Sequence, residues 1–261
     1  MTNLSRSEIQ YSQVLQRLVN AVKKDIDDQI VPLVHAKAPE YVQDEWGADI
    51  QAIVDTLLAK WRSPPFVRLA NQMATSFVRT TLSVIDRQNK REFGIDVLQN
   101  SPKMRANLGA AAIQNAKLIE SIPEQYLNRV SNSVFANMRT GLLPAVVAKQ
   151  IEHEYGVTQS RARFIARDQT AKVNGELTKQ RQVDAGYLYF KWLDGNDERV
   201  RSSHRAIANA DVGFGPGVYR WDKLPKNERG EPIQPGSDFQ CRCSSRPIRN
   251  SKVAQNKEKA A

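Results

Sequence analysis

Apolar residues recur at spacings of three, four and seven positions between residues 4 and 89, and this periodicity constrains the fold more than any other feature. Prolines interrupt the pattern, and it predicts helices over 1–38, from about 40 to 63, and from about 66 to 89. Isolated helices of this length are marginally stable in water, so the apolar stripes predict a helical bundle. No pattern in residues 1–99 is typical of a catalytic site, and we interpret this region as an assembly or docking region.

Helix-boundary signals predict shorter helices after residue 100. Ser121 and Glu124 have the spacing of a capping box, which predicts a helix start. Gly156 is suited to the position after a helix C-terminus, and Thr158 would begin the next helix. That last helix is predicted to run to about Asp184.

Two charged residues, Arg167 and Asp168, fall near the apolar stripe of this last helix. A charge in such a position must be paired or hydrogen-bonded to be tolerated. We therefore predict that Arg167 and Asp168 pair within the C-terminal domain, in a structural ion or hydrogen-bond network with the strand that follows, rather than face solvent.

The C-terminal part changes to an alternating, aromatic-rich pattern that is typical of strands. It predicts strands over 187–193, 218–221 and 239–248, and a helix over 198–207 with Asp197 as its N-cap. The predicted fold class is mainly α, with an N-terminal helical bundle followed by a small α+β C-terminal domain with a short sheet. We expect this domain to span residues 100–248, with a flexible basic tail over 249–261.

The only two cysteines of the chain, Cys241 and Cys243, lie two positions apart and face the same way on a strand. A disulfide between them would be strained, whereas paired thiolates suit a soft metal ion such as zinc. His204 is predicted to meet them as a third ligand, and Asp197, Asp238 or water would supply a fourth. The alternative is a metal-free cluster, with the cysteines as small apolar groups and the histidine bonded to a backbone carbonyl. The spacing rules favour this alternative narrowly, so we predict no cofactor and keep zinc as a hypothesis.

The positive charge is confined to the later part of the chain. Residues 1–100 carry twelve basic and twelve acidic side chains, whereas residues 101–261 carry the whole net charge of +10. This asymmetry favours an anionic partner, with non-specific double-stranded DNA as the leading candidate and a merely solvated surface as the alternative. The candidate contacts are Arg161, Arg163, Lys172, Lys179, Arg181, Arg246, Arg249 and Lys252.

Enzymatic function is not favoured by these residues. Zinc deaminases need a glutamate two positions after the histidine, where this chain has Ala206, and a Cys-x-x-Cys pair. Asp194, Asp197 and Glu198 would collect a divalent ion in a metal-dependent hydrolase, but a charged turn before a helix is more often a capping feature. No run of residues is apolar enough for a membrane span or a signal peptide, which predicts no membrane partner.

Four stretches in order carry a family resemblance: S-I-P-E-Q-Y-L at 121–127, S-R-A-R-F-I-A-R-D-Q-T-A-K at 160–172, W-L-D-G-N-D-E-R-V-R-S-S-H-R-A at 192–206 and P-G-S-D-F-Q-C-R-C at 235–243. Together they resemble the phage Mu F-like minor head proteins, a family of phage head morphogenesis proteins. The resemblance implies a structural minor capsid protein of a tailed phage that acts beside the portal protein and the major capsid protein. It also implies a place inside the virion with the packaged DNA, in several copies per head, after assembly in the host cytoplasm. A nucleic-acid-binding module without a capsid role remains the alternative.

Overall fold

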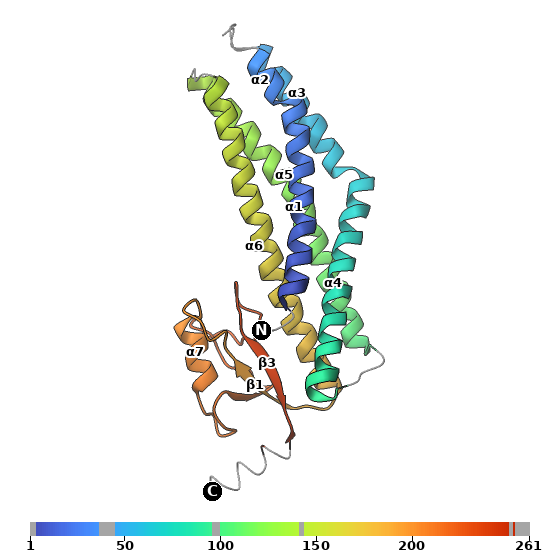
Figure 1. The fold of residues 1–261 in the computed structure, drawn as a ribbon, viewed down its shortest axis with the longest axis vertical. Coiled ribbons are helices and arrows are strands. Elements are labelled where there is room, and N and C mark those ends of the chain that lie inside the picture. Colours follow the sequence, from blue (N-terminus) through green and yellow to red (C-terminus); the bar gives the residue numbers. More distant parts are fainter. Residues whose placement is uncertain (1–3, 37–44, 96–99, 141–143, 251–252, 254–261) are drawn as a thin grey trace. The chain divides into compact units, whose positions relative to one another are not determined.

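The computed structural model describes residues 4–36, 45–95, 100–140, 144–250 and 253, and helices dominate these ranges (Figure 1). The mainly α fold with a small sheet, predicted from the sequence, is confirmed. No helix in the described ranges is both long and apolar enough to cross a membrane. The long helices are α1 (Leu4–Gln29), α3 (Glu45–Arg62), α4 (Pro64–Phe93), α5 (Pro102–Thr140) and α6 (Pro144–Asp184), with the short α2 (Val31–Ala36) after α1.

The predicted helix boundaries within α5 and α6 are wrong. Ser121 lies inside α5, where its hydroxyl donates to the carbonyl of Leu118 (2.7 Å) instead of capping a helix start. Thr158 does the same inside α6, bonding the carbonyl of Glu154 at 2.7 Å. Gly156 stays helical, at a cost of about 1 kcal/mol relative to alanine. Burial of the apolar α6 residues before and after Gly156 offsets this cost.

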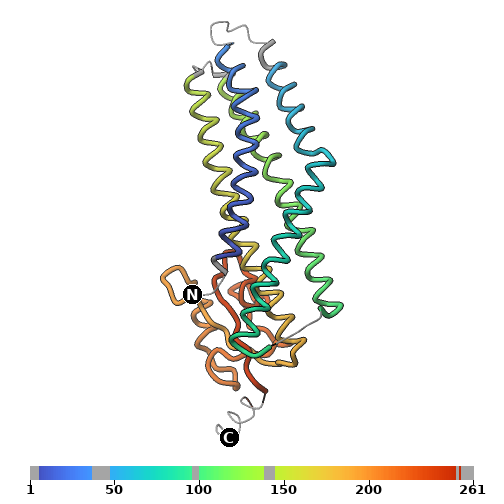
Figure 2. Tube along the Cα trace, turned by 45° about the vertical axis from the view of Figure 1, so that its right-hand side comes forward, coloured from blue at the N-terminus to red at the C-terminus, as the bar shows by residue number. Residues whose placement is uncertain are grey.

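The chain forms two compact units, and each draws on separate stretches of sequence. One unit comprises 9–76 and 112–166, and the other comprises 1–8, 77–111 and 167–261. In the first unit, parts of α1, α3, α5 and α6 run side by side (Figures 1 and 2). Their apolar stripes meet in a core that includes the fully buried side chains Leu15, Ile50, Leu57, Ile119, Ile122, Tyr126 and Leu127.

The second unit contains an antiparallel sheet, which has the strand order β2-β1-β3 among the described residues. Its strands are β1 (Tyr189–Leu193), β2 (Val218–Arg220) and β3 (Ser244–Ile248), and the helix α7 (Ser202–Asn209) lies between β1 and β2 in sequence. β1 and β2 lie where the alternation predicts them. The third strand begins later than predicted, at Ser244, because residues 239–243 form a loop.

The edges of this sheet are short or irregular. β2 has three residues, and β3 contains a buried proline, Pro247, opposite Phe190 of β1. Proline has no backbone N–H to donate to a ladder and is therefore confined to edge strands.

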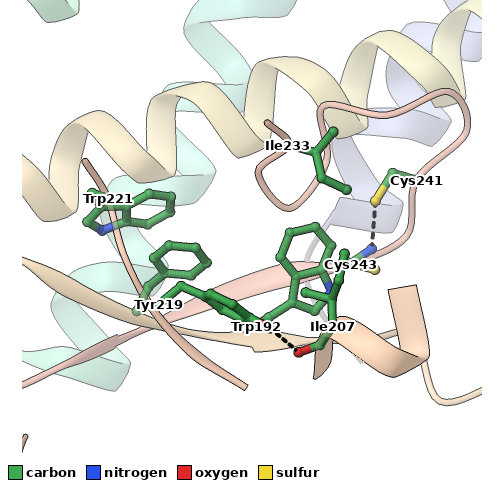
Figure 3. Close-up of a cluster of buried hydrophobic side chains, with 8 residues drawn as sticks. Trp192, Ile207, Tyr219, Trp221, Ile233, Cys241 and Cys243 are labelled. Carbon is green, nitrogen blue, oxygen red and sulfur yellow. Dashed lines mark hydrogen bonds between the residues drawn. The ribbon is translucent and has the colours of Figure 1, made fainter. Parts of the chain in front are cut away.

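One face of the sheet packs into an apolar cluster that reaches the two cysteines (Figure 3). The rings of Phe190 and Trp221 stack at 3.8 Å, and the Tyr219 hydroxyl donates to the carbonyl of Ile207 in α7 at 2.8 Å. The sheet thereby fixes α7, which carries His204, relative to the loop before β3. The cluster consists of Phe190, Trp192, Ile207, Tyr219, Trp221, Ile233, Cys241 and Cys243.

Candidate metal centre

The structure brings His204, Cys241 and Cys243 together in a buried cluster. The His204 Nδ1 atom lies 3.7 Å from Sγ of Cys241 and 3.5 Å from Sγ of Cys243. The three candidate ligand atoms all lie within 4.8 Å of one another, and the two cysteines form no disulfide. The predicted meeting of these residues, separated by 37 positions in sequence, is therefore confirmed.

The cysteines reach the histidine from a loop rather than from a strand. The backbone N–H groups of Gly236 and Cys243 each donate to Sγ of Cys241 at 3.4 Å, and Figure 3 shows the second of these bonds. Gln240, before the first cysteine, has a positive φ of 53°, which turns the chain back toward α7. The loop conformation thus aims both sulfurs at the same ring nitrogen.

Asp168 holds this loop against α6. One carboxylate oxygen accepts the backbone N–H of Gln240 at 2.9 Å, and the other pairs with Lys172 at 2.8 Å. Asp168 is therefore buried and paired within the C-terminal domain, as predicted, and Lys172 is its ionic partner because residues four apart on a helix face each other. Arg167 instead lines a cavity beside the cluster.

The second nitrogen of the histidine ring has a partner of its own. His204 Nε2 lies 3.1 Å from a carboxylate oxygen of Asp238. Asp238 is in turn held by the backbone N–H of Phe239 (2.8 Å) and by Arg201 (3.4 Å). The Trp192 ring meets His204 edge-on at 5.6 Å between centroids. These contacts fix the ring plane and leave Nδ1 facing the sulfurs.

The electrostatics of the cluster favour one thiolate. Hydrogen bonds from Cys243, His204 and two backbone N–H groups lower the pKa of Cys241 against the opposing effect of burial. The hydrogen bond with Cys241, together with burial, raises the pKa of Cys243. Hydrogen bonds with Cys241 and with Asp238 raise the pKa of His204, although burial acts in the other direction. These contacts therefore favour ionisation of Cys241 over ionisation of Cys243.

A cavity of about 190 Å³ opens beside the three residues. The cavity wall is rich in arginine, from positions that sequence reasoning did not assign to the site. The sequence did indicate that two of these arginines lie near the site, because Arg201 lies one helical turn before His204 and Arg242 lies between the two cysteines. The other lining residues are Arg167, Arg199, Val200 and Gln240.

Asp197 is predicted both as a helix N-cap and as one of three candidates for a fourth ligand, and the structure does not place it as the N-cap. α7 begins at Ser202 after Arg201, without a side-chain cap. The Asp197 carboxylate accepts the backbone N–H of Arg199 at 3.0 Å and pairs with Arg242. Asp194 accepts the backbone N–H of Asn196 at 3.1 Å, so it likewise stabilises a turn.

Two of the basic residues predicted to contact DNA face the interior. Arg181 has a side chain only 3% exposed, and its Nε and Nη2 atoms bind both carboxylate oxygens of Asp86 at 2.7 and 2.9 Å. Arg161 donates to the Ser121 hydroxyl at 2.9 Å, and burial lowers its pKa. These two candidates on α6 are therefore not placed on its surface as free basic groups.

The other candidates differ in exposure. Lys172 pairs with Asp168, and Lys179 lies over the ring of Trp221 at 5.7 Å, so both side chains are partly occupied. Arg163, Arg246 and Arg249 are exposed. Lys252 lies outside the described residues.

Comparison with known proteins yields one family and one relative. Residues 128–246 match the family described as Phage Mu protein F like protein. A protein of Haemophilus influenzae (strain KW20 / Rd), which bears the name Uncharacterized protein, is 32% identical to this chain. The alignment has a length of 268 residues and covers 96% of this chain. The chain spans about half of the length of this relative (56%). No solved structure matches the chain. All residues of the candidate metal centre lie within the family match.

Proposed function

We propose that the chain, whose residues 128–246 match the phage Mu protein F like family, is a structural minor head protein that acts in head morphogenesis of a tailed phage. The proposed partners are the portal protein, the major capsid protein and packaged double-stranded DNA. The proposed location is the virion, inside the head.

The observation that carries this proposal is the convergence of family-like stretches in one unit. Asp168 comes from the stretch 160–172, His204 from 192–206, and the cysteines from 235–243. The contacts between Asp168 and Gln240 and between His204 and both sulfurs join these three stretches. The family-like residues thus serve mainly to build one small domain, which supports a structural role more than a catalytic one.

Head composition tests the assembly role. We expect a tagged copy of this chain, expressed with the portal and major capsid proteins of the same phage genome, to copurify with portal rings and with assembled heads. Quantitative mass spectrometry of purified heads should then give several copies per head, fewer than the major capsid protein. Heads that assemble with normal yield and DNA content without the chain, and that exclude it when it is present, would contradict the proposal.

Salt-dependent binding tests the DNA contact, which we assign to the exposed Arg246 and Arg249 beside the end of β3. Each phosphate neutralised by an arginine contributes about 0.9 to the log–log slope of affinity against salt. We expect the double variant Arg246→Ala/Arg249→Ala of the full chain to reduce this slope by about 1.8 on unrelated duplexes. Arg62→Ala/Arg68→Ala removes the same charge from exposed positions in the neutral part of the chain and should leave the slope unchanged. Equal loss in both variants, or binding independent of salt, would rule out a local contact at β3.

A further inference from the structure

We propose that His204, Cys241 and Cys243 bind one zinc ion through Nδ1 and the two sulfurs, with a water molecule from the adjoining cavity as the fourth ligand. The inference is independent of any role in a phage head. It depends on four features of the described residues: ligand spacing, the second histidine nitrogen, backbone bonds to sulfur, and the cavity.

The spacing of the donor atoms suits tetrahedral zinc. With Zn–S bonds of about 2.3 Å and Zn–N bonds of about 2.05 Å, a sulfur and a nitrogen ligand on one ion lie about 3.6 Å apart. The observed separations from His204 Nδ1 are 3.7 Å to Cys241 and 3.5 Å to Cys243. Both sulfurs therefore lie at the separation from Nδ1 that ligation of one zinc ion requires. Two thiolates and an imidazole are also a ligand set that selects zinc over magnesium or calcium.

The histidine is oriented as a metal ligand is. A ligating histidine commonly donates its other ring N–H to a carboxylate, which fixes the tautomer and makes the ligating nitrogen more basic. Here Nε2 meets Asp238 at 3.1 Å, while Nδ1 faces both sulfurs. The Phe239 N–H, Arg201 and His204 together lower the pKa of Asp238 against the effect of burial, so the carboxylate that orients the ring is held in its charged form.

The loop also stabilises negative charge on sulfur. Two backbone N–H groups point at Cys241 Sγ, although neither is needed to place a neutral thiol. Zinc would allow both cysteines to ionise, since thiolate ligation releases their protons.

A water molecule in the adjoining cavity would complete the coordination, because all three ligand residues line that cavity. Among the described residues, the metal-ligating group comprises only these three side chains. Asp197 is engaged by Arg242 and Asp238 by His204 Nε2, so neither carboxylate is free to serve. The cavity of about 190 Å³ has room for a water molecule next to the sulfurs.

Metal analysis of the full chain tests this proposal. Protein purified under reducing conditions without chelator should contain about one zinc per chain, and Cys241→Ser, Cys243→Ser and His204→Ala should lose it. The matched control is His153→Ala, because His153 is a solvent-exposed histidine on α6 and should keep full zinc content. Asp238→Asn should still bind zinc, but with affinity lowered about 10–100-fold in competition with a chelator.

A second measurement uses the unmodified protein, so that the test of the metal site does not depend on variants that fail to fold. After removal of zinc under reducing conditions, addition of Co²⁺ should give the intense visible absorption of a tetrahedral cobalt–thiolate site, and one equivalent of zinc should abolish it. Unmodified protein without stoichiometric zinc and without this spectrum would overturn the proposal. Zinc content that survives in all three ligand variants would also overturn it, because the metal would then lie elsewhere.

Discussion

Replacing Gly175 with alanine should destabilise the protein by about 3 kcal/mol, although the same change stabilises most helices. Gly175 lies within α6, and a Cβ atom there would come 2.2 Å from the backbone carbonyl oxygen of Pro235. The loop backbone is equally close to the helix backbone at Gly236 (φ 90°), because a Cβ there would lie 2.4 Å from the carbonyl oxygen of Ala171 in α6. Both obstacles are backbone atoms, so the clash is relieved only if the loop moves away from the helix.

Gly156→Ala is the matched control for this expectation. Gly156 lies in the same helix, and a Cβ there meets nothing within 4 Å. This variant should gain about 1 kcal/mol in the free energy of unfolding, measured by chemical denaturation. The Gly175→Ala variant should also lose zinc affinity, because residues 235–236 position the N–H that bonds Cys241 Sγ. Equal stability of the two variants would show that α6 and the loop do not approach closely in solution.

Asp86→Ala should cost about 3–5 kcal/mol, because it leaves the guanidinium of Arg181 buried without its carboxylate. The opposite deletion, Arg181→Met, should cost much less. Asp86 is 38% exposed and reaches water when its partner is absent, whereas Arg181 is 3% exposed and does not. The side-chain oxygen of Asn100 accepts a hydrogen bond from Arg181 at 2.8 Å. This bond reduces the loss of stability in Asp86→Ala, but it does not replace the negative charge of the carboxylate.

The order of these two costs is the measurable result, obtained from denaturation curves of the full chain. Arg163→Met, at an exposed position of the same helix, should change stability by less than about 0.5 kcal/mol. A larger cost for Arg181→Met than for Asp86→Ala would contradict this expectation, and would mean that the guanidinium contributes chiefly through partners other than Asp86, such as Asn100.

Helix content was predictable from sequence because periodicity reports burial directly, whereas the boundaries depended on local signals that tertiary packing overrides. Ser121 and Thr158 have side chains that either cap a helix start or bond a carbonyl one turn back. The choice is made by buried residues on both sides, which keep α5 and α6 continuous. The interior position of Arg181 was accessible from the same periodicity, since it follows Val173 and Leu177 at four-residue spacing.

The candidate site was predictable to the extent that it depends on rare residue types. One histidine and the only two cysteines fall in one small domain, and their chemistry predicts that they meet. Their supporting contacts were not predictable, because Asp168 reaches Gln240 across 72 positions and no spacing rule extends that far. Its pairing with Lys172 was within reach, since residues four apart on a helix face each other.

The short β2 and the proline of β3 also determine how copies of the chain can associate. An exposed sheet edge with a regular row of free N–H and C=O groups is a template for a strand from another molecule, and this leads to aggregation. Three residues on one side and a strand interrupted by Pro247 on the other offer little of such a template. Copies that accumulate at high local concentration would therefore have to associate through side chains, and would be protected from fibre-like polymerisation through this sheet.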